Sequence, residues 1–116
     1  MAGNYFELCG RLGWIDYKST DNGYLITTIT LGVKKNKEEW NNFFIKFFDT
    51  ADSKNTIAEK LQRKTKGDYI RVKGYITLDK FKPNGSDKEV SNISLIGTYF
   101  NGIHYDQFEK GYVDDV

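Results

Sequence analysis

The sequence predicts an all-β fold, in which five strands close into a barrel and one short helix lies between the third and fourth strands. Three observations support this prediction. Five segments alternate apolar and polar residues with the period of two that a strand with one buried face requires. Aromatic and β-branched residues fill these segments, and aromatic residues make up 16% of the chain. One segment, which begins after residue 55, has apolar residues at helical spacing instead.

Length and composition bound the class of protein. A chain of 116 residues suits one domain with a single core. With one cysteine, Cys9, and one histidine, the chain has neither an internal disulfide nor the usual Cys/His zinc site. The sequence has no run of about 18 apolar residues and no charged-then-apolar leader. We therefore expect a cytoplasmic protein that needs no membrane, metal or cofactor.

Charge is distributed unevenly, although the net formal charge is only +1. Residues 1–105 carry 16 Lys and Arg against 12 Asp and Glu, whereas residues 106–116 carry one Lys against four Asp and Glu. A basic body with an acidic end indicates a surface that binds a polyanion. We expect the barrel to span residues 1–105 and a short acidic C-terminal tail to span residues 106–116.

The first two strands are predicted over residues 4–12 and 24–33. A turn between them is predicted at Asp21–Gly23, because Asn and Gly tolerate the positive φ of tight hairpins. Alternation assigns to the core Phe6, Leu8, Gly10 and Leu12 of the first strand, and Leu25, Thr27, Ile29, Leu31 and Val33 of the second. Trp14 and Tyr17 follow the first strand and are expected to cap the barrel, with a contact to DNA as the alternative.

The third strand, residues 40–48, has two faces of different composition. Phe43, Ile45 and Phe47 form a wholly apolar face. The other face combines rings with an amide and a cation: Trp40, Asn42, Phe44, Lys46 and Phe48. Rings that stack on bases, beside cations that meet phosphates, are typical of a surface that binds single-stranded nucleic acid. The residues alone leave open a second interpretation, in which both faces are buried.

The helix is predicted to begin at Thr56 and to end at Gly67, about three turns later. Thr56 and Glu59 have the spacing of a capping box, and glycine is a common helix stop. The last two strands are predicted over residues 69–78 and 89–100. Residues expected to face the core are Ile70, Val72, Gly74, Ile76 and Leu78 in the fourth strand, and Ile93 and Leu95 in the fifth.

Five strands with a helix between the third and fourth have the element order of an OB-fold barrel, in which strands 2 and 3 and adjoining loops bind oligonucleotides. Further rings and cations surround this predicted face. The candidate nucleic-acid-binding residues are Trp40, Phe44, Lys46, Phe48, Arg71, Lys73, Tyr75, Phe81, Arg11, Lys34 and Lys35. No nucleophile–histidine pair, phosphate-binding glycine loop or metal cluster is present, and we expect no enzyme.

Four segments resemble bacterial and phage single-stranded DNA-binding proteins. The stretch NYFELCGRLG, residues 4–13, is similar to the opening strand of that family. Asn22-Gly23 matches its turn, and Ile29-Thr30-Leu31 its Thr-rich second strand. The stretch KGDYIRVKG, residues 66–74, is similar to the segment after its helix. The resemblance spans residues 4–100, and the compact length is more like a phage-encoded member than a cellular one.

The resemblance implies a non-enzymatic protein that binds single-stranded DNA during replication, recombination and repair, as a tetramer or a dimer. Trp40 or Phe44 matches the family's stacking ring on strand three, and Phe81 matches the ring on the long hairpin. Asn36 stands about where some members have another stacking tryptophan. The chain lacks the family's long linker and Pro-Phe tip, so the acidic end is left as a possible site for replication or recombination proteins.

Two other functions fit the same residues. One is an OB-fold adaptor whose outward rings contact another protein, since aromatic residues are enriched at such interfaces. The other is an RNA-binding module, because stacking and phosphate contacts do not distinguish the sugars without a contact to the 2′-hydroxyl. Of the three functions, we expect sequence-independent binding of single-stranded DNA, with the adaptor and the RNA-binding module as alternatives.

Overall fold

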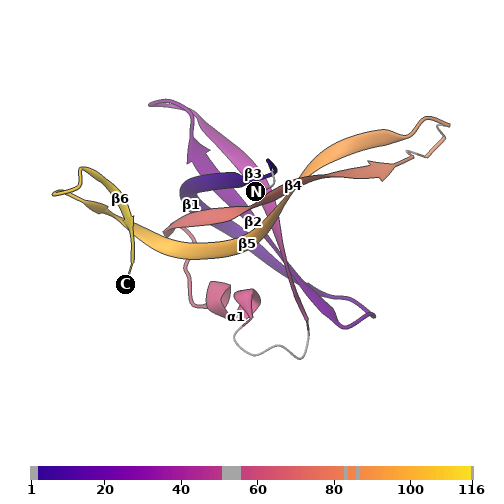
Figure 1. Cartoon of the computed structure of the whole chain (residues 1–116), viewed down its shortest axis with the longest axis horizontal. Coiled ribbons are helices and arrows are strands. Elements are labelled where there is room, and N and C mark those ends of the chain that lie inside the picture. The colour runs from indigo at the N-terminus through magenta and orange to yellow at the C-terminus, as the bar shows by residue number, and fades with distance from the viewer. Residues whose placement is uncertain (1–2, 51–55, 83, 86, 116) are drawn as a thin grey trace.

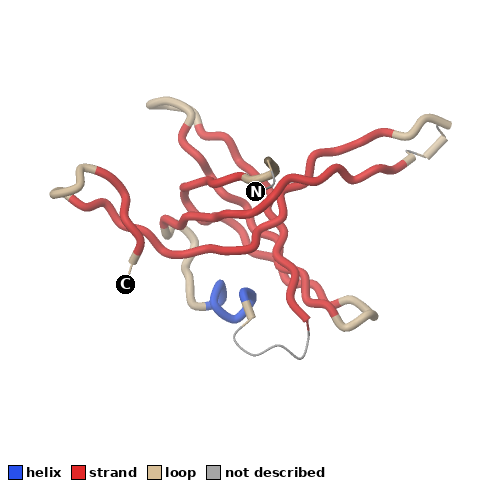
Figure 2. Tube along the Cα trace, viewed as in Figure 1, coloured by secondary structure: helices blue, strands red, loops and turns tan. Residues whose placement is uncertain are grey.

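The computed structural model describes residues 3–50, 56–82, 84–85 and 87–115, apart from the side chains of Thr50 and Phe81. Six strands and one short helix are arranged as a barrel with projecting hairpins (Figures 1 and 2). The elements are β1 (Phe6–Ser19), β2 (Tyr24–Lys34), β3 (Trp40–Thr50), α1 (Ile57–Gln62), β4 (Tyr69–Phe81), β5 (Val90–Asp106) and β6 (Gly111–Asp114).

The first five strands close into the predicted OB-fold barrel. Their order is β3-β2-β1-β4-β5, and a parallel pairing of β3 with β5 joins the two ends of the sheet. The other barrel pairings are antiparallel. β1 has two partners along its length: β4 pairs with residues 6–11 and β2 with residues 11–19. The predicted fold class is confirmed.

The core contains the side chains that alternation assigned to the inside of the central strands. Ile29, Leu31, Ile45 and Phe47 have no exposed surface, and Leu61 of α1 packs into the same cluster. Thr27, also fully buried, is polar, and its hydroxyl has no hydrogen-bond partner among the described residues. The inner face of β3 is therefore a core face, as predicted.

The helix is shorter than predicted. Its beginning is as expected, since the Thr56 hydroxyl accepts a hydrogen bond from the Glu59 amide at 3.1 Å. However, α1 ends at Gln62 rather than near Gly67. The reason is a competing backbone pairing: the Gly67 amide donates to the Leu12 carbonyl at 2.7 Å, and the Leu12 amide donates to the Asp68 carbonyl at 2.7 Å. These bonds bind residues 67–68 to β1 and leave no room for another helical turn.

The hairpin of β4 and β5 extends beyond the barrel, as Figure 1 shows at the upper right. Here the predicted inward assignment is wrong for Ile76, Leu78 and Ile93, which are 38%, 55% and 72% exposed. The three residues keep the register of the core face, with Leu78 opposite Ile93. However, the strands outrun the core, so neither face of the hairpin is covered within the described part of the chain.

The C-terminal segment also differs from the expectation of a tail. β5 continues to Asp106 instead of ending near residue 100, and β6 pairs with it through Ile103–Asp114 and Asp106–Gly111. The Asp115 amide then donates to the Gly102 carbonyl at 2.8 Å. Residues 106–115 are thus folded onto the sheet as the second arm of a hairpin, seen at the left of Figure 1.

Candidate nucleic-acid interface

The outer side of β3 presents rings and a cation to solvent. Phe44 is 63% exposed and Phe48 47%, while the alternating neighbours Ile45 and Phe47 are fully buried. In the antiparallel register, Thr30 and Ile26 of β2 lie opposite Phe44 and Phe48, with small or β-branched side chains that leave the rings open. The interpretation with both faces of β3 buried is therefore wrong for this chain. We call the surface formed by Trp14, Trp40, Phe44, Lys46 and Phe48 the outer face.

Trp40, at the start of the outer face, is surrounded by cations. The Arg11 guanidinium lies 5.0 Å from the centre of its ring and 5.4 Å from that of Tyr69. Lys34 Nζ lies 5.9 Å from the Trp40 ring. Arg11 of β1 and Tyr69 of β4, which are far apart in the sequence, thus meet beside the end of β2 and the start of β3. The arrangement places positive charge beside an aromatic ring, as the binding of bases and their phosphates requires.

A hollow of about 500 Å³ opens beside the Trp40 ring. Arg11, Gly32, Asn42 and Lys66 contribute to its lining. A Cβ at Gly32 would lie 3.5 Å from the Trp40 ring, so a larger side chain there would extend over the indole. The hollow combines an aromatic wall, an amide and two cations, groups that suit a nucleotide.

We place Trp14 on the outer face, although the sequence favours a capping role over a contact with DNA. β1 continues to Ser19, and its register shifts between Leu12 and Ile15. The Trp14 amide donates to the Thr30 hydroxyl at 2.7 Å, and the indole is 56% exposed. The expectation that Trp14 caps the barrel is therefore wrong. Trp14 alternates with the polar residues Asp16 and Lys18, which indicates an outward position. The bulge at Gly13 interrupts the alternation from Leu12, so the pattern of the first strand does not extend to Trp14.

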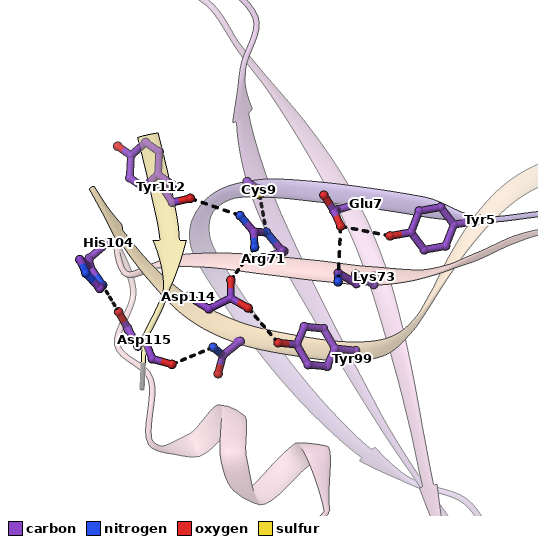
Figure 3. Close-up of polar contacts among 11 residues, drawn as sticks. Tyr5, Glu7, Cys9, Arg71, Lys73, Tyr99, His104, Tyr112, Asp114 and Asp115 are labelled. Atoms are coloured by element: carbon purple, nitrogen blue, oxygen red, sulfur yellow. Dashed lines mark hydrogen bonds and ion pairs between the residues drawn. The ribbon is translucent and has the colours of Figure 1, made fainter. Parts of the chain in front are cut away.

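Arg71 and Lys73 lie on a different wall of the barrel, formed by the first half of β1, β4 and β5 (Figure 3). Both are paired with carboxylates of the chain itself. Arg71 Nη1 lies 2.6 Å from Asp114 Oδ1, and Lys73 Nζ lies 3.6 Å from Glu7 Oε1. The hydrogen bond from Arg71 Nε to Cys9 Sγ, with Asp114 and Glu7 nearby, raises the pKa of Arg71, which stays charged. The structure does not bring these two cations together with the outer face.

The C-terminal hairpin forms much of this second wall. Tyr112 stacks on Tyr69 with 5.2 Å between ring centres, and the Tyr99 hydroxyl donates to Asp114 at 3.2 Å. Restricted solvation and this hydrogen bond raise the pKa of Tyr99 above its ordinary value. Two features of the sequence agree with this packing, the acidic pair Asp114-Asp115 and the nearby tyrosines, but no local pattern sets the register that places them beside Arg71.

Replacing Asp114 by asparagine tests whether this carboxylate keeps Arg71 from phosphates. The pair is partly exposed, so we expect a stability loss of only about 0.2–1 kcal/mol. The released guanidinium should add one phosphate contact, which steepens the dependence of log K on log salt by about 0.7. Oligo-dT titration at several salt concentrations measures this slope. The matched control is Asp106→Asn, since Asp106 accepts hydrogen bonds from the Phe108 and Glu109 amides and pairs with no cation among the described residues. An unchanged slope in Asp114→Asn would show that Arg71 meets no phosphate.

The remaining candidate nucleic-acid-binding residues differ in their surroundings. Lys35 pairs with Glu39 at 3.4 Å in the loop before β3. Tyr75 is 42% exposed and lines a hollow together with Phe48, so it adjoins the outer face. Lys46 lies opposite Thr28 and has no ion-pair partner in the described part of the chain. The side chain of Phe81 lies outside the described residues.

The described residues contain neither a candidate metal site nor a candidate membrane span. There, no three His, Cys, Asp or Glu side chains are grouped closely enough to hold a metal ion. Nor is any described helix long and apolar enough to cross a membrane.

The barrel and its outer face define the class of the protein: an OB-fold domain with an open surface of rings and cations. No protein-family model matches the sequence, and no curated protein sequence is similar to it. Among solved structures, the fold is similar to the crystal structure of the mitochondrial single-stranded DNA binding protein Rim1 from S. cerevisiae. The TM-score is 0.65 and the sequence identity 15%, over 88% of this chain and 96% of that one. At this identity, the likeness shows the shared fold.

Proposed function

We propose that this protein binds single-stranded DNA, without sequence preference, on the outer face of its barrel. The observation that carries the proposal is the two-sided strand β3. Its inner residues Ile45 and Phe47 are fully buried in the core, while Trp40, Phe44 and Phe48 are exposed on the same side as Lys46. The fold shared with a single-stranded DNA binding protein supports the same function. Exposed rings on a sheet that is otherwise well packed are costly to leave in water unless a partner covers them.

The mechanism follows from the two kinds of group on the outer face. Each base has a π face, so stacking on Trp40, Phe44 or Trp14 accepts any sequence. Arg11, Lys34 and Lys46 then meet the phosphates and release their counterions. No step makes or breaks a covalent bond, and the protein protects and organises the strand by binding alone.

The resemblance and the fold together lead us to propose a homo-oligomer, a dimer or a tetramer. β4 pairs with one edge of residues 6–10, whereas β2 pairs with β1 only from Arg11 onward. The other edge of residues 6–10 therefore has no strand beside it among the described residues, and such an edge suits pairing with a second copy. Sedimentation equilibrium measures the number of subunits. A protein that stays monomeric at high concentration would contradict this proposal.

Binding of labelled oligo-dT at several salt concentrations tests the function. We expect measurable affinity that falls as salt rises, by about 0.7 log units per tenfold salt for each phosphate contacted. Oligo-U and duplex DNA of equal length serve as competitors. Stronger competition by oligo-U would favour the RNA-binding alternative, and no affinity for any nucleic acid would favour the protein adaptor.

A further inference from the structure

A second basic surface lies between α1 and β5, outside the outer face. It is a groove of about 470 Å³, which we call the helix groove. Lys60, Arg63 and Lys64 line its helix side, and Tyr99 and Asn101 line its sheet side. Lys60 lies in the last turn of α1, and Arg63 and Lys64 follow the end of the helix. Their amides donate to the carbonyls of Lys60 and Leu61, at 3.2 and 3.0 Å, so the chain turns once more and keeps the three cations close together. Figure 1 shows α1 beside β5.

The cations of the helix groove differ from Arg71 and Lys73 in their ion pairing. Within the described residues, none of Lys60, Arg63 and Lys64 forms an ion pair or a side-chain hydrogen bond. An acidic side chain does approach, since Asp115 and Lys64 both lie next to Gly102. Asp115 Oδ1 binds His104 Nδ1 at 2.6 Å, whereas Oδ2 is the oxygen beside Gly102 and lies near Lys64 Nζ without forming an ion pair with it. The groove thus differs from the wall around Arg71, where each cation has its own carboxylate.

The helix groove is continuous with the outer face. A smaller hollow of about 280 Å³ is lined by Phe48 and Tyr75, whose rings are 47% and 42% exposed. This hollow shares Ile57 and Thr98 with the helix groove. Phe48 is the last ring of the outer face, so an extended ligand that passes it enters the helix groove next.

We propose that a single strand bound to the outer face continues past Phe48 and Tyr75 into the helix groove, where Lys60, Arg63 and Lys64 bind its phosphates. This inference rests on the proposed function. Cations near a helix C-terminus also interact favourably with the helix dipole, which is reason enough for a basic residue there. The helix dipole does not explain why Lys60, Arg63 and Lys64 all line one groove, opposite a tyrosine and an amide, next to the exposed rings of Phe48 and Tyr75.

The test uses two lengths of oligo-dT and two variants of the full chain. An oligomer of about 6 nucleotides is short enough for the outer face alone, and one of about 35 exceeds the 4–16 nucleotides that one OB-fold covers. The triple variant Lys60→Gln, Arg63→Gln, Lys64→Gln removes the charges. The control, Lys60→Arg, Lys64→Arg, keeps them. All three side chains are at least partly exposed, and thermal unfolding verifies that both variants fold.

For the long oligomer, we expect the triple variant to bind more weakly, with a salt slope lower by about 2, which is three phosphates at about 0.7 each. Its affinity for the short oligomer should equal that of the wild type, and the control should bind both lengths like the wild type. An unchanged slope on the long oligomer would overturn the inference and leave the groove to another anionic partner. Equal losses at both lengths would also overturn it, since they indicate a general effect of charge.

The same titrations separate this inference from the function on which it rests. If the wild type binds both lengths but the triple variant is indistinguishable from it, only the helix groove is excluded. If the wild type binds neither length, the proposed function itself is wrong and the inference falls with it.

Discussion

Replacing Trp40 by alanine is expected to weaken the binding of oligo-dT by about 1–3 kcal/mol, or about 5- to 150-fold, because one base loses its stacking partner. The loss should be similar at low and high salt, since the indole carries no charge. Arg11 and Lys34 lose a cation–π partner in the same variant, but both keep their charge for the phosphates. Fluorescence anisotropy of a labelled oligomer measures the change.

A control for Trp40→Ala is available in another exposed ring. Phe108 is 98% exposed in the turn between β5 and β6, away from the outer face. Phe108→Ala should leave the affinity unchanged. If both variants weaken binding equally, exposed rings act without regard to position and the outer face has no special role.

Two substitutions on β3 should separate stability from binding: Phe47→Ala is expected to destabilise the fold, and Phe44→Ala to weaken the binding of oligo-dT. Phe47→Ala removes a fully buried ring that packs edge-on against Phe100, with 6.2 Å between ring centres. We expect a loss of about 3–5 kcal/mol in the free energy of unfolding. Gly97 lies directly against the Phe47 ring, so that side of the cavity has no side chain that can move in. Urea denaturation measures the loss.

Phe44→Ala, three positions earlier on the same strand, is the matched comparison. Its ring is exposed, so we expect a stability change within about 0.5 kcal/mol, as for most surface substitutions. Its affinity for oligo-dT should fall by about 1–3 kcal/mol. A Phe44→Ala protein that is strongly destabilised, or that binds like the wild type, would contradict the division of β3 into a core face and a binding face.

The alternation of residues predicted the barrel because each central strand has one face in a common core. Ile45 and Phe47 are buried and Phe44 is exposed, as the period of two requires. The same rule failed for Leu78 and Ile93, which alternate correctly but lie on a hairpin that outruns the core. Local pattern specifies which face a residue lies on. Whether anything covers that face depends on how far the other strands extend.

The site was predicted where it depends on one strand and missed where it depends on distant pairings. Trp40, Phe44 and Lys46 share a face by their spacing alone. By contrast, Arg71 was expected to meet phosphates, and no local pattern indicates that Asp114, 43 residues away, pairs with it. The place of Trp14 depends on a bulge in β1, which shifts the register by one residue and moves a side chain to the opposite face.

The most direct test of the outer face is the fluorescence of Trp40 itself. The chain has two tryptophans, so Trp14→Phe leaves Trp40 as the only indole and keeps a ring at position 14. When this variant is titrated with oligo-dT, we expect its tryptophan emission to be quenched in parallel with the rise in anisotropy of the labelled oligomer. Binding that leaves the Trp40 emission unchanged would show that the strand lies elsewhere on the barrel, and would contradict the outer face as the binding surface.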